Sequence, residues 1–136
     1  MLTVDQIAAK IRNIPDFPEP GIQFKDITPL LKDAEGFRDT IELLSQPWVG
    51  QKIDGVVAIE ARGYMLGAPM AARLGCGFIP VRKVGKLPFK TFKAEYALEY
   101  GTFAIEIHQD AVLSGERVLL VDDVLATGGT LAAAAS

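Results

Sequence analysis

Two adjacent carboxylates and a turn of small residues follow one apolar segment near the end of the sequence. Residues 118–121 are a continuous apolar run, which is typical of a strand buried on both faces of a parallel sheet. Asp122 and Asp123 follow directly, and a Thr-Gly-Gly-Thr turn comes shortly after them. Such a turn between a strand and a helix presents backbone N–H groups to a phosphate, while carboxylates accept hydrogen bonds from vicinal hydroxyls. The pattern therefore suits a phosphorylated sugar, and the competing interpretation is a solvated acidic turn.

This turn is neither of the two commonest phosphate-binding loops. No Gly-Lys-Ser/Thr follows it, which excludes a Walker loop, and the Gly-x-Gly-x-x-Gly pattern of dinucleotide sites is absent.

A second apolar run, residues 53–59, also ends in a charged turn that contains glycine. The turn reads Glu60-Ala61-Arg62-Gly63, and a helical segment follows it. Arg62 is thus either a second anion-binding group at a strand end or the surface partner of Glu60.

Basic residues follow a third predicted strand, residues 77–82. Arg82 and Lys83 stand at its end, and residues 85–93 carry three further lysines among Gly, Pro and Thr. That composition is typical of a mobile surface loop. The loop is either simply solvated or a lid that closes over a polyanion.

The segment around Phe24 is extended and carries an aromatic ring before a Lys-Asp pair. Phe24 is either a core residue or a platform on which a planar heterocycle stacks. We interpret two other candidates as structural, because the single His108 has no nucleophile beside it in the sequence and the single Cys76 has no metal-ligand companions.

The remaining patterns predict the elements that position these side chains. Helices are expected over residues 3–13, 34–46 and 64–74, and strands over residues 53–59, 77–82, 103–107 and 118–121. Strands that alternate with helices predict an α/β fold with a mainly parallel sheet. A length of 136 residues predicts one domain, and a net charge of −3 gives no attraction to nucleic acid or to an anionic membrane. No signal-peptide pattern is present, so we expect a cytoplasmic protein.

Five segments together resemble the adenine branch of the type I phosphoribosyltransferase family. They are Pro-Gly-Ile-Gln-Phe-Lys-Asp at 20–26, Glu-Ala-Arg-Gly at 60–63, Val-Arg-Lys-Val-Gly-Lys-Leu-Pro at 81–88, Leu-Glu-Tyr-Gly at 98–101 and the stretch from Val121 to Thr130. The last segment alone indicates only the superfamily, whereas the segments that contain Phe-Lys-Asp, Gly-Lys-Leu-Pro and Leu-Glu-Tyr-Gly indicate the adenine branch. Lys25 and Tyr64 stand where relatives often carry Arg and Phe.

The resemblance implies a type I phosphoribosyltransferase fold, with residues 1–33 on the base side, a sheet core over 34–136 and a lid loop at about 83–101. It also implies the transfer of a phosphoribosyl group from 5-phosphoribosyl 1-diphosphate (PRPP) to adenine, which gives AMP and diphosphate. The resemblance further implies Mg²⁺, which would be held mainly by PRPP near Asp122 and Asp123. It also implies a homodimer.

The resemblance assigns roles residue by residue. The 5′-phosphate would be bound by Ala126, Thr127, Gly128, Gly129 and Thr130, and the ribose by Asp122 and Asp123. The diphosphate would be bound by Glu60, Ala61, Arg62, Arg82, Lys83 and Lys86, with a Glu60–Ala61 peptide that can be cis. Adenine would be bound by Gln23, Phe24 and Lys25, and Glu99 would assist proton movement at the purine.

Members of this family continue beyond the point that corresponds to Ser136, so we expect the C-terminal helix and strands to be missing from this sequence. Three alternatives stay open: a phosphoribosyltransferase for another base, a non-catalytic PRPP- or nucleotide-binding regulator, and an inactive fragment.

Overall fold

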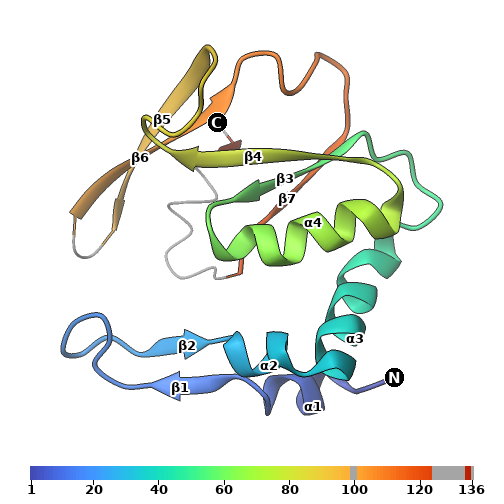
Figure 1. Ribbon diagram of the computed structural model, residues 1–136, viewed down its shortest axis with the longest axis vertical. Coiled ribbons are helices and arrows are strands. Elements are labelled where there is room, and N and C mark those ends of the chain that lie inside the picture. Colours follow the sequence, from blue (N-terminus) through green and yellow to red (C-terminus); the bar gives the residue numbers. More distant parts are fainter. Residues whose placement is uncertain (99–100, 124–133, 136) are drawn as a thin grey trace. The chain divides into compact units, whose positions relative to one another are not determined.

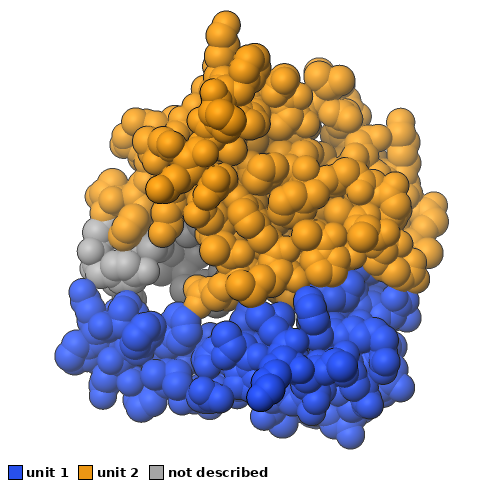
Figure 2. Space-filling view, in the orientation of Figure 1, with its two compact units in different colours: residues 1–47 blue, residues 48–136 orange. Residues whose placement is uncertain are grey.

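The computed structural model describes residues 1–98, 101–123, 134 and 135. The chain forms two compact units, Met1–Pro47 and Trp48–Ser136, which Figure 2 colours separately.

The first unit combines short helices with a two-stranded ribbon. Its elements are α1 (Val4–Ala8), β1 (Arg12–Ile14), β2 (Phe24–Asp26), α2 (Thr28–Lys32) and α3 (Ala34–Ser45), followed by the 3₁₀ turn η1 (Gln46–Trp48). Helix α1 begins with the capping box that its sequence predicts, since the Thr3 and Gln6 side chains each accept a hydrogen bond from the other residue's backbone N–H. Asp33 caps α3 by accepting a hydrogen bond from the N–H of Gly36 at 2.7 Å.

The helix predicted over residues 3–13 is too long. Helix α1 ends at Ala8, and residues 12–14 pair with β2 as an antiparallel strand. An ion pair between Arg12 and Asp26 and a hydrogen bond from Lys25 to Asn13 join the two strands. Pairing with a distant segment therefore overrides the local helical periodicity, as tertiary contacts commonly do.

The second unit is built on one five-stranded mixed sheet with the order β5-β6-β4-β3-β7 (Figure 1). The strands are β3 (Gly55–Ile59), β4 (Gly77–Lys83), β5 (Thr91–Leu98), β6 (Gly101–His108) and β7 (Val118–Val121). Strands β4, β3 and β7 are parallel, which confirms the predicted parallel centre. Strands β5 and β6 form an antiparallel hairpin that extends the sheet along β4.

Helix α4 (Arg62–Leu74) packs on one face of the sheet, against β3, β4 and β7. A Cβ atom on Gly67 would lie only 2.6 Å from the Cβ of Ala58, so this glycine permits the close approach of helix and strand. Gly75 ends the helix in the left-handed conformation, at φ +73°, as its sequence predicts. The opposite face of the sheet carries the buried cluster Val57, Ile59, Val81 and Ile105.

The expectation of a loop over residues 83–101 needs correction, because Thr91–Leu98 is a strand and Gly101 begins the next one. Every residue of β5 has a partner on β6, and hydrophobic side chains such as Phe92 and Ala94 lie opposite Ile107 and Ile105. Phe92, Ala94 and Tyr96 alternate with the charged Lys93 and Glu95, which is the pattern of a strand with one apolar face. In the described part of the chain, no helix is long and apolar enough to cross a membrane.

Candidate active site

The parallel arrangement of β3, β4 and β7 brings three charged turns to one edge of the sheet. The carboxyl ends of parallel strands meet at a common edge, which is where ligands bind in open α/β sheets. Ile59 lies beside Val81, and Ala58 lies beside Val121. Glu60 and Asp122, which follow β3 and β7, therefore lie at the same edge as Arg82 near the end of β4; Figure 1 shows these three strands side by side.

The two aspartates form a compact pair with Arg62. The backbone N–H of Asp123 donates a hydrogen bond to Oδ1 of Asp122 at 2.8 Å. The side chain of Asp123 is 4% exposed, and its Oδ2 lies 2.9 Å from Nε of Arg62. That Oδ2 accepts no hydrogen bond within the described residues, so the contact with Arg62 is an ion pair rather than an aligned hydrogen bond.

Burial raises the pKa of Asp122 to about 6. The nearby charge of Asp123 and a hydrogen bond shared with its carboxyl group make smaller contributions to this increase in pKa, whereas the Asp123 N–H and the Arg62 charge oppose it. Ionisation of the pair is therefore unfavourable in the folded protein, and a hydroxyl donor or a cation bound at this edge would stabilise the ionised form.

Glu60 pairs with Arg82 from the neighbouring strand. Its Oε1 accepts hydrogen bonds from Nε of Arg82 and from the backbone N–H of Lys83, each at 3.1 Å. The Arg82 hydrogen bond is the main reason that the pKa of Glu60 lies below its ordinary value. The surface pair between Arg62 and Glu60, one of the two sequence-based interpretations, is thus replaced by two separate ion pairs. The Glu60–Ala61 peptide is cis, as the resemblance implies.

Tyr64 fixes the start of α4 to the end of β4. Its hydroxyl donates a hydrogen bond to the carbonyl oxygen of Val81 at 2.9 Å, and the N–H of Glu60 donates to the same oxygen. Desolvation of this hydroxyl raises the pKa of Tyr64 to about 12. A Cβ on Gly63 would lie 3.0 Å from the carbonyl oxygen of Val121, so the helix also starts close to β7.

The turn between β4 and β5 carries the expected lysines. The N–H of Lys86 donates to the carbonyl oxygen of Lys83 at 3.3 Å, and Nη1 of Arg82 lies 3.5 Å from the carbonyl oxygen of Lys86. Arg82, Lys83 and Lys86 thus belong to one connected segment at the end of β4.

The candidate base-binding residues Gln23, Phe24 and Lys25 belong to the first compact unit, whereas the charged groups above belong to the second. Phe24 is half-buried, and its ring packs edge-on against Phe17 with the centroids 5.0 Å apart. The neighbouring Lys25 is exposed and binds Asn13.

Two of the predicted groups of site residues lie outside the described residues. These are Glu99 and the phosphate loop from Ala126 to Thr130. The sequence did not predict the roles of two groups. These are the hydroxyl of Tyr64 and the carboxylate of Glu106, which binds Gly85 and Thr91. Both look like ordinary members of a helix and a strand in the sequence, because their partners are distant along the chain.

Two residues that we interpreted as structural have contacts that agree with that role. Burial raises the pKa of the Cys76 thiol, which makes it a weaker nucleophile than an ordinary cysteine. The ring of His108 packs edge-on against Phe89, with the centroids 6.2 Å apart.

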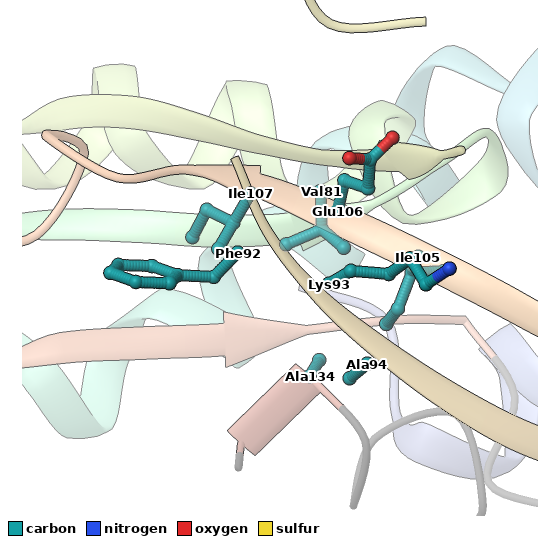
Figure 3. A pocket seen from close by; sticks show the side chains of 8 residues that line it. All are labelled: Val81, Phe92, Lys93, Ala94, Ile105, Glu106, Ile107 and Ala134. Atoms are coloured by element: carbon teal, nitrogen blue, oxygen red, sulfur yellow. The ribbon is translucent and has the colours of Figure 1, made fainter. Parts of the chain in front are cut away.

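A mostly apolar cavity of about 280 Å³ lies against the β5–β6 hairpin (Figure 3). Its lining side chains come from Val81, Phe92, Lys93, Ala94, Ile105, Glu106, Ile107 and Ala134. The aspartate pair does not line it, so the cavity is distinct from the charged edge described above.

Comparison with known proteins agrees with this geometry. The family model for the phosphoribosyl transferase domain matches residues 26–136. An adenine phosphoribosyltransferase of Thermoanaerobacter sp. (strain X514) is 59% identical over 134 residues, which cover 98% of this chain and 78% of that protein. The corresponding protein of Roseiflexus sp. (strain RS-1) is 58% identical over 128 residues, covering 94% of this chain and 74% of the relative.

Solved structures of similar proteins confirm the predicted type I fold. The crystal structure of adenine phosphoribosyltransferase from Thermoanaerobacter pseudethanolicus has a TM-score of 0.93 at 59% identity, with 98% of this chain and 77% of that chain covered. The Giardia lamblia enzyme in complex with 9-deazaadenine has a TM-score of 0.94 at 40% identity, with 98% and 75% covered. With sequence, fold and site in agreement, the chain belongs to the adenine phosphoribosyltransferases.

Proposed function

We propose that this protein transfers the phosphoribosyl group of PRPP to N9 of adenine, which yields AMP and diphosphate in purine salvage. The observation that carries this proposal is the Asp122–Asp123 pair beside Arg62 at the common strand edge, in a chain of this family. In the reaction, the bond from ribose C1 to the diphosphate oxygen breaks, the bond from C1 to N9 forms, and N9 loses its proton.

The aspartate pair is suited to hold the ribose. Its oxygens accept hydrogen bonds from the two vicinal hydroxyls, and fixing the ring favours a transition state with oxocarbenium character. Partial burial removes some of the water contacts of Asp122, which strengthens each hydrogen bond that it makes to a sugar hydroxyl.

The diphosphate is bound by the Glu60-Ala61-Arg62 turn and by Arg82, Lys83 and Lys86. Glu60 neutralises part of the Arg82 charge and fixes the direction of its guanidinium. Arg82 is thereby oriented before the ligand arrives, and an oriented cation stabilises the negative charge that develops on the departing diphosphate.

On the base side, Phe24 stacks against adenine, while backbone groups near Gln23 and Lys25 recognise its edge. The half-exposed ring and its edge-on support from Phe17 suit a stacking surface. Glu99 as the proton-handling carboxylate and Ala126–Thr130 as the 5′-phosphate loop remain proposals from the sequence.

Mg²⁺ fits the donor set at the aspartate pair. Carboxylate oxygens are hard ligands, and Mg²⁺ commonly combines one or two of them with water and substrate phosphates. Within the described residues, no group of three or more His, Cys, Asp and Glu side chains could hold a metal ion. PRPP and water would therefore hold most of the ion's coordination sites, near Asp122 and Asp123, and the ion would neutralise phosphate charge.

We also propose a homodimer in the cytoplasm, as the family resemblance implies. Both statements concern the intact protein and can be checked by light scattering and by fractionation of cells.

A panel of bases tests the proposed function. Purified protein is mixed with PRPP, Mg²⁺ and an equimolar mixture of adenine, hypoxanthine, guanine and orotate, and the nucleotides formed are separated by chromatography. We expect AMP to dominate. A product nucleotide that carries another base, at an equal or larger amount, would contradict the assignment to adenine.

A further inference from the structure

One carboxylate on β6 binds both ends of the basic turn between β4 and β5. Glu106 accepts a hydrogen bond from the backbone N–H of Gly85 at 2.8 Å and another from the hydroxyl of Thr91. Gly85 follows the end of β4, and Thr91 is the first residue of β5. Glu106 therefore closes the segment 85–91, which contains Lys86.

The sheet order explains why this residue can reach both ends. Strand β6 lies between β4 and β5, and Glu106 is the register partner of Arg82 on one side and of Lys93 on the other. In Figure 3 its carboxylate points away from Ala94 and Ala134, which line the apolar cavity. The two hydrogen bonds are the main reason that the pKa of Glu106 lies below its ordinary value, so the group is charged near neutral pH.

The same turn is tied to the strand that carries the site cations. Nη1 of Arg82 lies 3.5 Å from the carbonyl oxygen of Lys86, and the N–H of Lys86 donates to Lys83. Gly85 has a φ of +86°, in the left-handed region that favours glycine, so the turn requires a glycine at this position. Fixing Gly85 therefore also fixes the backbone that carries Lys83 and Lys86.

We propose that Glu106 is a positioning residue for the diphosphate of PRPP. By binding Gly85 and Thr91, it orients the turn so that Lys83 and Lys86 face the strand edge where the diphosphate binds. This inference rests on the proposed function, and it adds a residue that contacts neither the substrate nor the reacting atoms. An oriented pair of cations binds a polyanion more tightly than the same cations on an unconstrained turn, because less conformational entropy is lost on binding.

Two variants and one control test the proposal in the full chain. Glu106→Gln keeps the shape but removes the negative charge, and Thr91→Val removes one donor while keeping a β-branched residue suited to a strand. Glu95→Gln is the matched control, because Glu95 lies on the adjacent strand with a side chain that is 67% exposed. Affinity for PRPP is measured by calorimetry, and the KM for adenine is measured by AMP formation.

For Glu106→Gln we expect the Kd for PRPP to rise about tenfold, the low end of the loss for a hydrogen bond to a charged acceptor, because the Gln oxygen can still accept one hydrogen bond. Thr91→Val should cause a smaller rise, Glu95→Gln should behave as wild type, and the KM for adenine should change less than twofold in all three. An unchanged Kd for PRPP would overturn the proposal. Equal losses for PRPP and adenine would also overturn it, because they indicate a purely structural role.

Hydrogen exchange at the Gly85 amide gives a readout that does not depend on turnover. The amide should exchange faster in Glu106→Gln than in wild type or Glu95→Gln, and unchanged exchange would contradict the role of Glu106. If Glu106→Gln does not fold, the Kd for PRPP of Thr91→Val tests the proposal instead: an increase supports it, and an unchanged value contradicts it. Wild-type protein that binds PRPP but forms no AMP would contradict the proposed function, while the PRPP titrations would still test Glu106.

Discussion

At the scale of single residues, Asp122 destabilises the ligand-free fold, although its carboxylate is the group proposed to bind the ribose. Its pKa of about 6 lies above its value of 3.8 in an unfolded chain, so the folded protein binds the extra proton more tightly. The tighter proton binding stabilises the folded state fully below about pH 4, and this stabilisation is lost as the pH rises through 6. At neutral pH the ionised Asp122 therefore destabilises the fold in the absence of ligand.

Replacement of Asp122 by Asn should make the ligand-free protein more stable at pH 7.5. We expect a gain of about 1 kcal/mol in the free energy of unfolding, after allowing for the partial exposure of the carboxylate. The gain should shrink toward pH 4, and AMP formation should fall sharply. Urea unfolding at several pH values, with the exposed Asp110→Asn variant as a control, measures the effect. A stability loss at pH 7.5 would contradict this account of the aspartate pair.

Phe24 allows a test of base stacking. Loss of a stacked ring typically costs about 1–3 kcal/mol per base, so Phe24→Ala should raise the KM for adenine by about five- to hundredfold. The Kd for PRPP should change much less. Similar losses of affinity for both substrates would mean that the ring serves the fold of the first unit rather than the base.

The site residues that could be predicted from the sequence are those that stand at the ends of recognisable strands. Asp122, Asp123 and Arg62 stand at strand ends, and the alternation of strand and helix predicts that edge. The partners themselves could not be predicted, because Arg62 contacts Asp123 and Glu60 contacts Arg82 only after the strands are placed side by side.

At the scale of elements, the buried strands and long helices were predictable, whereas short and exposed ones were not. Strand β7 and helix α3 have strong apolar patterns, and the predictions for both are confirmed. Strands β1 and β5 have weak patterns and owe their structure to pairing with β2 and β6. Pro80 has no N–H to donate to a neighbouring strand, and β4 pairs with β6 only beyond it, at Arg82 and Lys83.

The packing of α4 on β3 predicts a clear effect of Gly67→Ala. A Cβ at this position would lie 2.6 Å from the Cβ of Ala58, so the helix must shift away from the sheet. Overpacking of this kind costs roughly 1–3 kcal/mol, which exceeds the gain of about 1 kcal/mol in helix propensity.

Thermal and urea unfolding of Gly67→Ala measure this loss. Gly77→Ala is a control for the added methyl group, because no atom lies within 4 Å of a Cβ built there. A Gly67→Ala variant as stable as wild type would mean that the helix packs less closely than the structure shows.

At the scale of the whole molecule, the residues proposed for the base and those proposed for the ribose and diphosphate belong to different compact units. The residues for the base lie in Met1–Pro47, and those for the ribose and diphosphate lie in Trp48–Ser136. The five sequence motifs predict the residues for the base and those for the ribose and diphosphate, because each motif is a short continuous segment. The division of the chain into two units has no comparable sequence signal, since no glycine- or serine-rich linker separates them.

The central claim is that both groups serve one transfer reaction, and product stoichiometry tests it most directly. Folded protein is mixed with PRPP, Mg²⁺ and adenine, and AMP and diphosphate are measured together over time. We predict that the two products appear in equal amounts, and that neither forms when adenine is omitted. Folded protein that releases diphosphate without AMP, or that produces neither, would contradict the account.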